Sequence, residues 1–362
     1  LHKAIRRQRQ MCIRDSTYTG ERMISLKTFL SGLALFCALA PSQAQDKFRV
    51  MEYNVENLFD CSHDSLKNDY EFQPDSPRGW TKARYYDKLA KIAKVILAAG
   101  DKQVPDLVGL CEVENEHCVQ DLVKNSPLRD AGYDFAITQS PDERGIDVVL
   151  LYQPATFRHL STHAIGIPSK EIDRRPTRDI LHVSGRIVTG DTLDVFVCHM
   201  PSRSGGEKQS EPYRLFTAGY LRRAADSVMA VRQHPNVIVM GDFNDYPSNR
   251  SIAEVIGAVR PGDQIEKTRL YNLMDGKEGG TYRYRGEWGT LDQMMVSGYL
   301  LEGNERIRAK YEDAQILKFP FLLEEDDRYG GESPSRTYWG KKYHGGYSDH
   351  LPVLLELELK EE

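Results

Sequence analysis

Short apolar runs that end in polar residues recur along this chain, and they predict the strands of a buried sheet. Residues 237–240 read Val-Ile-Val-Met, Gly241 interrupts the run, and Asp242 and Asn244 follow. Residues two apart in extended backbone point to the same side, so this carboxylate and amide would project together from a strand end. Open α/β sheets usually keep their sites there. The alternative is an ordinary polar turn, because Asp and Asn favour turns.

The same pattern gives the other elements. Strands are predicted over residues 48–55, 105–111, 134–137, 146–152, 180–188, 193–198, 290–296 and 347–357. Helical periodicity predicts helices over residues 83–99, 115–124 and about 213–232. Residues 60–82 are expected to form a loop, and residues 301–345, the least patterned part, a long loop near the site. Because no linker or repeat interrupts residues 46–362, we expect one domain there.

The first 44 residues have a different pattern. Residues 1–22 show no apolar periodicity and are interpreted as a non-native or disordered leader. From Met23 onward, Lys27 precedes an apolar run, and small residues end at Ala44, which predicts a signal peptide over residues 23–44 and a secreted or periplasmic protein. A membrane anchor is the alternative, but the run is short and no later stretch is apolar enough, so we expect no stable membrane insertion.

Charge and cysteine content refine this picture. Residues 1–44 contain seven Lys/Arg and two Asp/Glu, so the remainder carries a net charge near −10, against −5 for the whole chain. Such a protein has no global basic field to attract nucleic acid. Cys111 and Cys198 lie in apolar runs and are predicted to be buried thiols, whereas Cys61 and Cys118 lie in loop-like stretches where a disulfide is possible.

The polar residues at the predicted strand ends suit one chemistry. They are Asn54, Glu112, His199, Asp242, Asn244, Asp292, Asp349 and His350. Glu112 and Asp349 offer hard oxygen ligands appropriate to Mg²⁺, with Mn²⁺ as an alternative. Asp242 can act as a general base on water. Asn54 and Asn244 can orient a phosphate or the nucleophile without adding charge.

The two histidines complete the set. His199 and His350 can donate to phosphate oxygens that gain charge as the bond breaks, and Asp292 can hold His350 in one tautomer. Together the residues indicate a metal-assisted phosphodiester or phosphomonoester hydrolase. Each residue alone also has a structural explanation, such as a helix cap, a solvated loop residue or a buried histidine. Their joint occurrence at strand ends favours an enzyme.

Residues 48–357 resemble the endonuclease/exonuclease/phosphatase superfamily, which includes pancreatic-type deoxyribonuclease, apurinic endonucleases, neutral sphingomyelinases and inositol-polyphosphate 5-phosphatases. The resemblance rests on Tyr53-Asn54-Val55, Cys111-Glu112-Val113, Cys198-His199-Met200, Gly241-Asp-Phe-Asn-Asp245, Leu291-Asp292-Gln293 and Ser348-Asp-His350. It implies an α/β fold, a four-layer α/β/β/α sandwich with two mixed, mainly antiparallel sheets that converge on one metal site.

The resemblance also implies roles. Glu112 would bind the metal, assisted by Asn54 and Asp349. Asp242 would activate water, and Asn244 would orient the phosphate.

For the histidines, the resemblance implies that His350, held by Asp292, stabilises the scissile phosphate. His199 would bind phosphate or protonate the leaving group. No feature of the sequence indicates a protein partner, and a monomer is expected.

Several further residues bear on the substrate. Arg203, in the loop of residues 201–206, could contact a phosphate, and this loop resembles that of exported bacterial members described as nucleases. Arg174, in a basic patch, could flank the cleft. The loop of residues 201–206 could equally be a charged surface loop, and a patch such as that of Arg174 is more often a solvated loop than a substrate clamp.

Tryptophans are a second source of substrate contacts. Trp80, Trp288 and Trp339 fall in loop-like stretches where an aromatic ring could stack on a base, although such residues more often cover the edge of a core. The chain has no long Lys/Arg run. We therefore expect a nuclease acting on nucleic acid, with a phosphatase or a phospholipid or sugar-phosphate phosphodiesterase as the alternative. A non-catalytic binding descendant is the third possibility.

Overall fold

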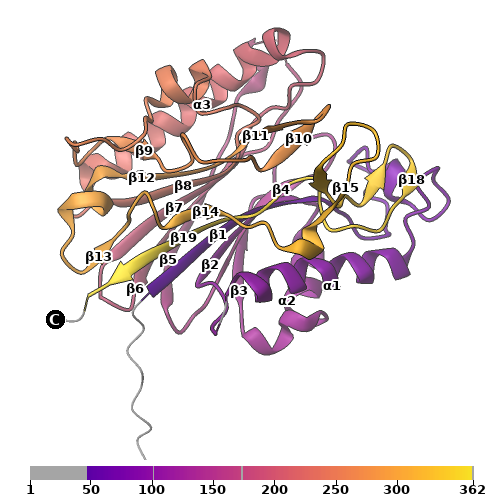
Figure 1. The fold of residues 1–362 in the computed structure, drawn as a ribbon, viewed down its shortest axis with the longest axis horizontal. Helices are drawn as coiled ribbons and strands as arrows, with labels where there is room; N and C mark the ends of the chain where they lie inside the picture. Colours follow the sequence, from indigo (N-terminus) through magenta and orange to yellow (C-terminus); the bar gives the residue numbers. More distant parts are fainter. Residues whose placement is uncertain (1–46, 101, 173, 361–362) are drawn as a thin grey trace, which may run out of the picture. The chain divides into compact units, whose positions relative to one another are not determined.

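Two β-sheets form the centre of the protein (Figure 1). The computed structural model describes residues 47–360 except 101 and 173. The first sheet has the order β13 (Ile307–Arg308), β19 (Val353–Leu359), β1 (Lys47–Leu58), β2 (Leu107–Val113), β4 (Asp147–Tyr152) and β3 (Asp134–Ile137), with β14 (Ala314–Ile316) also paired to β19. Of these pairs, β1 and β2 run parallel and the others antiparallel.

The second sheet has a similar plan. Its order is β5 (Phe157–Ile165), β6 (Ile180–Ile187), β7 (Thr192–His199), β8 (Asn236–Asp242), β12 (Asp292–Ser297) and β9 (Leu270–Asn272). Here β7 and β8 run parallel, and the other neighbours run antiparallel. Both sheets are therefore mixed and mainly antiparallel, which confirms the predicted fold class.

Helices cover the outer faces of the two sheets (Figure 1). The longer helices are α1 (Lys82–Ala99), α2 (Glu116–Lys124) and α3 (Glu207–Val231). Short helical turns are η1 (Tyr70–Phe72), η2 (Pro127–Ala131), η3 (Ser169–Ile172), η4 (Ser251–Ile256), η5 (Tyr299–Gly303) and η6 (Pro320–Leu322). α1 and α2 begin at polar caps: the side chains of Thr81 and Asn115 accept hydrogen bonds from backbone N–H groups of the first turn.

Three apolar clusters separate four layers. One packs α1 and α2 against the first sheet and includes Leu89 of α1 and Val108 and Leu110 of β2, all fully buried. A second joins the inner faces of both sheets. A third packs α3 and η4 against the second sheet, where Leu221 and Val239 are fully buried. Burial of these large side chains is the main stabilising term for such a sandwich.

Three small hairpins lie outside the two sheets. They are β10 (Tyr282–Tyr284) with β11 (Glu287–Gly289), β15 (Leu323–Glu325) with β16 (Glu332–Pro334), and β17 (Tyr338–Trp339) with β18 (Lys342–Tyr343). The prediction of one long loop over residues 301–345 is therefore wrong, because β13 to β18 and two short helices lie in that stretch. Strands of two or three residues are too short to give a readable alternation.

Other boundaries also differ from expectation. α3 begins at Glu207, before the predicted start at 213, and it contains Pro212. The last strand begins at Val353 instead of residue 347, because Pro352 and the polar residues before it precede the pairing with β1. The edge strand β5 carries mostly exposed residues and gave no apolar pattern.

The cysteines are all free thiols in the described part of the chain, including Cys61 and Cys118. Cys111 and Cys198 are buried, as predicted. Among the residues that the structure describes, no helix is long and apolar enough to cross a membrane. The predicted leader and signal peptide, residues 1–44, lie outside the described residues.

Candidate active site

Three predicted site residues lie side by side at one edge of the second sheet. His199 and Asp242 are the last residues of the parallel strands β7 and β8 and pair with each other, and Asp292, the first residue of β12, pairs with Asp242 on its other side. Gly241 permits this close approach, since a Cβ at that position would lie 1.8 Å from the Cys198 carbonyl oxygen. The glycine before Asp242 is therefore required by packing.

Irregular backbone in the first sheet directs two more side chains to the same place. Asn54 of β1 pairs with Cys111 of β2, and the register then shifts in both strands. Asn57 and Glu112 have positive φ angles of 61° and 67°. The Asn57 backbone N–H donates to Glu112 Oε2 at 3.0 Å. Bulges of this kind re-aim a side chain beside active sites.

Asp242 is the point where the two sheets meet. Its Oδ2 accepts from Asn54 Nδ2 at 3.1 Å and from Asn244 Nδ2 at 3.2 Å, and its Oδ1 accepts from the Asn244 backbone N–H at 2.8 Å. His199 Nε2 lies 3.6 Å from Asp242 Oδ2 and 3.9 Å from Glu112 Oε1. The structure thus places Asn54, Asn244 and His199 around the Asp242 carboxylate, and Glu112 beside His199.

His350 approaches Asp242 from the segment before β19. Its Nδ1 lies 2.8 Å from Asp292 Oδ2, and its Nε2 lies 3.9 Å from Asp242 Oδ2. Ser348, two residues earlier, donates its hydroxyl to the Asn54 carbonyl oxygen at 2.7 Å and accepts from the His350 backbone N–H at 3.1 Å. These bonds attach the Ser348–His350 segment to β1 and hold the imidazole in one orientation.

Burial and neighbouring charges shift the pKa values of Asp242, His199 and His350 in different directions. Burial raises the pKa of Asp242 to about 7, with His350 opposing and Asp292 adding to this effect. Burial also lowers the pKa of His199, as do the charges of Arg178 and Arg144. For His350, burial alone would lower the pKa, but the carboxylates of Asp292 and Asp242 outweigh it and raise the pKa. The two histidines therefore favour opposite charge states at neutral pH.

The donor set fits a hard divalent cation. Ligand atoms of Asp242, Asp292 and His350 lie within 4.8 Å of one another, and Asp292 Oδ1 is buried without a hydrogen-bond partner. Glu112, predicted as the main ligand, also points its carboxylate toward His199 at the site. Such a concentration of carboxylate oxygens, left partly unpaired, is appropriate to Mg²⁺ or Mn²⁺.

Asp349, another predicted ligand, has a cationic neighbour. Arg336 Nη2 lies 2.6 Å from Asp349 Oδ2. The same arginine approaches Glu56, with Nε 3.7 Å from Glu56 Oε1. Asp349 therefore lies between the site and a buried charge network.

That network contains residues that sequence reasoning missed. Glu56 accepts the Thr337 backbone N–H at 2.6 Å, and Lys88 of α1, also buried, donates to Thr337 Oγ1 at 2.6 Å. Burial raises the pKa of Glu56 to about 7 and lowers that of Lys88 to about 8. Glu56 lay within the polar group after the first predicted strand, which was a usable signal. For Arg336 and Lys88, the sequence contained no signal of a role at the site.

The two arginines predicted to bind substrate both have protein partners. Arg203 Nε donates to the Asn244 carbonyl oxygen at 2.7 Å, and its guanidinium lies 4.3 Å from the ring centroid of Tyr246. Arg174 lies 3.9 Å from the ring centroid of Tyr213 in α3. Arg203 thus supports the loop that carries Asn244, and its predicted contact with phosphate stays a prediction.

The fold and the site define a hydrolase that acts on phosphate ester bonds. The chain belongs to the Endonuclease/Exonuclease/phosphatase family, whose sequence model matches residues 49–359. Members of this family depend on divalent metal ions, and the acidic groups described above could bind one. No curated protein sequence matches the chain significantly.

Solved structures share the fold at low sequence identity. A family member from Bacteroides thetaiotaomicron is 18% identical with a TM-score of 0.57, over 87% of this chain and 99% of that one. A mannosyl-6-phosphatase from the same species is 16% identical with a TM-score of 0.53, over 86% and 99%. D. rerio TDP2, solved with a single-strand DNA product, is 16% identical with a TM-score of 0.53, over 87% and 100%. At these identities the similarity shows the fold alone.

Proposed function

We propose that this protein is a nuclease that hydrolyses phosphodiester bonds of nucleic acid, with Mg²⁺ as its metal and Mn²⁺ as a substitute. Glu112, Asn54 and Asp349 would hold the ion. When bound, such an ion neutralises phosphate charge and lowers the pKa of bound water. Asp242, whose Oδ2 is hydrogen-bonded to Asn54, would accept the proton of the attacking water.

The other site residues act on the phosphate itself. His350, oriented by Asp292, donates to a phosphate oxygen that gains charge during in-line attack. Asn244 positions that phosphate, and His199, buried beside Asp242, contacts it from the β7 side. Each of these roles agrees with the side-chain positions around Asp242.

Two arginines beside the predicted metal ligands carry the choice of a nuclease. Arg336 Nη2 lies 2.6 Å from Asp349 Oδ2, and Arg144 Nη2 lies 3.8 Å from Glu112 Oε2. The two guanidinium groups are thus placed beside two different predicted ligands. A nucleic-acid strand carries phosphates on both sides of the scissile bond, whereas a phosphomonoester does not.

A sugar-phosphate phosphatase or phosphodiesterase is the second candidate, and one observation favours it. The pocket beside Asp349 also carries Glu325 and Asp327, whose carboxylates can accept hydrogen bonds from sugar hydroxyls. Such carboxylates would repel the further phosphates of a long strand.

Hydrolysis assays distinguish these candidates. The purified protein would be given supercoiled plasmid, a single-stranded oligonucleotide, and a panel of phosphomonoesters and phospholipids, each with Mg²⁺ or with EDTA. We expect Mg²⁺-dependent cleavage of nucleic acid. Release of phosphate or headgroup without any cleavage of nucleic acid would overturn the proposed nuclease.

We also propose that the protein is exported, with cleavage near Ala44, and that it works as a monomer. The first described strand begins at Lys47, so removal of residues 1–44 would leave every described element intact. Mass spectrometry of the product secreted by a bacterial host tests the cleavage site, and light scattering tests the monomer. An exported mass that still includes residues 23–44 would contradict the cleavage.

A further inference from the structure

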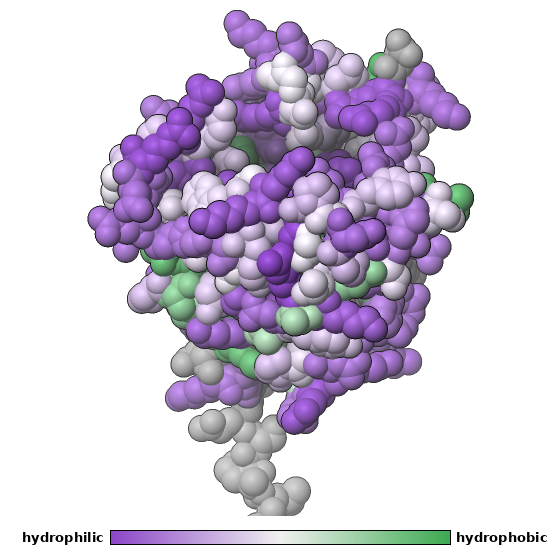
Figure 2. All heavy atoms as spheres, turned by 90° about the vertical axis from the view of Figure 1, so that its right-hand side faces the viewer, coloured by the Kyte–Doolittle hydropathy of each residue, from purple (hydrophilic) through white to green (hydrophobic). Residues whose placement is uncertain are grey.

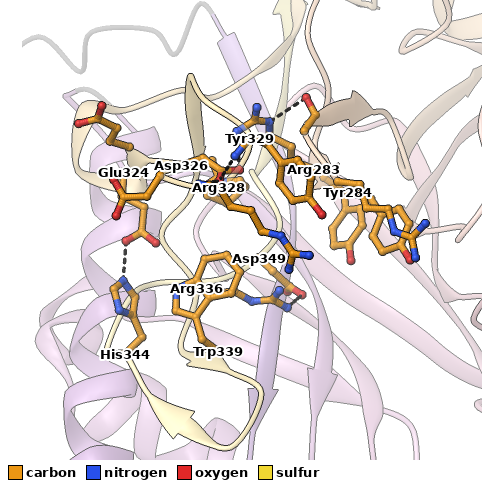
Figure 3. Close-up of a pocket in the computed structure, with 17 residues that line it drawn as sticks. Arg283, Tyr284, Glu324, Asp326, Arg328, Tyr329, Arg336, Trp339, His344 and Asp349 are labelled. Carbon is orange, nitrogen blue, oxygen red and sulfur yellow. Dashed lines mark hydrogen bonds and ion pairs between the residues drawn. The ribbon is translucent and has the colours of Figure 1, made fainter.

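A pocket of about 740 Å³ opens beside the active site, between the three hairpins that lie outside the sheets (Figure 3). The hairpins are β10–β11, β15–β16 and β17–β18. Figure 2 views the side that carries β15 and β18 and shows a hollow bordered by hydrophilic residues. The volume falls within the range of about 300–1,000 Å³ that is typical of ligand pockets.

Two contacts join this pocket to the site. Asp349 and Arg336 belong to the pocket wall, and Arg336 Nη2 donates to Asp349 Oδ2 at 2.6 Å. Tyr282, also in the wall, forms a β-bridge with His350, and their ring centroids lie 4.9 Å apart. A group in the pocket can therefore be attached directly to a phosphate held by His350.

Three large aromatic side chains in the wall remain open to solvent. Tyr284, Tyr329 and Trp339 are 58%, 45% and 47% exposed. Exposed rings occur elsewhere too, such as Tyr70 and Tyr86, but these do not line the pocket, whereas Trp80 is fully buried and donates its indole N–H to a backbone carbonyl. Exposed rings gathered in a concave site indicate a surface on which a planar or apolar group stacks.

Each of these rings has an arginine beside it. The guanidinium carbons of Arg328 and Arg336 lie 5.1 Å from the ring centroids of Tyr329 and Trp339, respectively. The guanidinium carbon of Arg285 lies 5.2 Å from the ring centroid of Tyr284. Figure 3 shows Arg328 extending toward Arg336 and Asp349. Rings and guanidinium planes together form the stacking platform that proteins use for unpaired bases.

The charged side chains of the pocket limit the kind of ligand that it can bind. Asp326 is paired with Arg283 at 2.8 Å, and Glu324 with His344 at 2.5 Å. The arginines beside the two tyrosines have no ion-pair partner among the described residues, so they are available to a phosphate. Glu325 and Asp327 also lack an ion-pair partner among the described residues, and their carboxylates can accept from base amino groups. The pocket therefore suits one uncharged ring with a phosphate at its edge.

We propose that this pocket holds one unpaired base of the nucleic acid, adjacent to the scissile phosphate, so that the enzyme selects single-stranded substrate. The inference rests on the proposed nuclease function. A paired base inside a duplex cannot enter a pocket bordered by three hairpins without losing its stacking and pairing, which costs a few kcal/mol. A single strand or a frayed end enters without this cost.

Replacing Trp339 with leucine tests the proposal. The full-length protein, as Trp339→Leu, Tyr329→Leu and a control Tyr86→Leu, would be assayed on a single-stranded oligonucleotide, its duplex, and oligonucleotides with one abasic position. The control removes an equally exposed ring from α1. Anisotropy in EDTA measures binding of the oligonucleotide without hydrolysis.

We expect Trp339→Leu to lower kcat/KM and binding affinity for the single strand about 5- to 150-fold, the value of one base–aromatic stack. For the same variant, kcat/KM for a small methyl aryl phosphodiester should change less than about twofold. In the wild type, one abasic position next to the cleavage site should lower kcat/KM by as much as the Trp339→Leu substitution does. Equal losses on every substrate, or full activity at abasic sites, would overturn the inference.

The two proposals fail in different ways. If the wild type cleaves no nucleic acid but still binds the single strand through Trp339, the nuclease function fails and the binding site stands. If it cleaves nucleic acid with no effect of Trp339 or Tyr329, the function stands and the pocket assignment fails. Binding of a sugar phosphate through Trp339, without binding of the oligonucleotide, would overturn the inference in favour of a sugar ring.

Discussion

Replacing Asp242 with asparagine should stop turnover without unfolding the protein. Asparagine keeps the shape of the side chain but cannot accept a proton from water. General-base catalysis contributes about 100- to 10,000-fold, which corresponds to about 3–5 kcal/mol of activation free energy at about 1.36 kcal/mol per tenfold. We therefore expect kcat to fall by at least about 100-fold in Mg²⁺, while KM changes little.

The structure also sets the effect on stability. The substitution weakens the bonds that Asp242 accepts from Asn54 and Asn244, each worth about 1 kcal/mol more when the acceptor is charged. It also removes one of several buried negative charges, since Asp292 and Glu112 both disfavour ionisation of Asp242. The two effects oppose each other, so the free energy of unfolding in EDTA should stay within about 1 kcal/mol of wild type.

Asp194 provides a matched control, because it is an equally buried aspartate in β7 away from the site. Its carboxylate accepts from Arg232 at 2.7 and 2.9 Å and from His182 at 3.0 Å. Asp194→Asn should cost about 3 kcal/mol of unfolding free energy but leave kcat of the folded protein intact. Urea titration and initial rates measure both quantities. Full activity in Asp242→Asn, or equal loss of kcat in both variants, would refute the assignment of the base.

Two further predictions concern the metal and acid stability. Glu112→Gln should raise the Mg²⁺ concentration needed for half-maximal activity by at least about tenfold, because a neutral amide is a weaker ligand than a carboxylate. Activity should recover at high Mg²⁺. An unchanged Mg²⁺ titration would remove Glu112 from the ligand set. Burial alone would raise the pKa of Asp194, but hydrogen bonds from Arg232, His182 and Ser184 outweigh it and lower that pKa below 3.8. The stability contributed by this carboxylate is therefore present above about pH 4 and is lost as the pH falls further. Asp194→Asn should accordingly flatten the decline of unfolding free energy below pH 4. Parallel declines in the wild type and the variant would contradict this.

Local apolar runs were sufficient to predict the centre of the fold. The run at residues 237–240 lies inside β8, and the polar residues directly after it, including Asp242, are at the meeting point of the sheets. A buried strand must be apolar on both faces, and its end must satisfy backbone groups with polar residues, so both signals are local in sequence. The same reasoning explains why His199 and Asp292 were recognisable as strand-end residues.

Contacts between distant segments could not be predicted in this way. Glu56 binds backbone groups of the hairpin at residues 337–338, more than 280 positions later, and neither partner carries a pattern that names the other. The predicted start of α3 at about residue 213 is too late, because the helix begins at Glu207 and extends through Pro212, although proline removes a helical hydrogen bond. Of the three tryptophans, Trp80 is core and Trp339 lines the pocket, a difference that depends on tertiary packing alone.

Backbone strain connects the pocket to the catalytic residues. In the described part of the chain, the residues other than glycine with positive φ are Glu56, Asn57, Glu112, Asn244 and Arg285. The left-handed conformation costs an L-residue about 1–2 kcal/mol, and it persists where surrounding structure holds a side chain in a required place. Four of these residues surround Asp242 or support the segments beside it, and the fifth projects from the β10–β11 hairpin into the pocket wall. The strain at Arg285 therefore fixes the β10–β11 turn beside the pocket, as the strain at Glu112 and Asn244 fixes the strand ends beside Asp242.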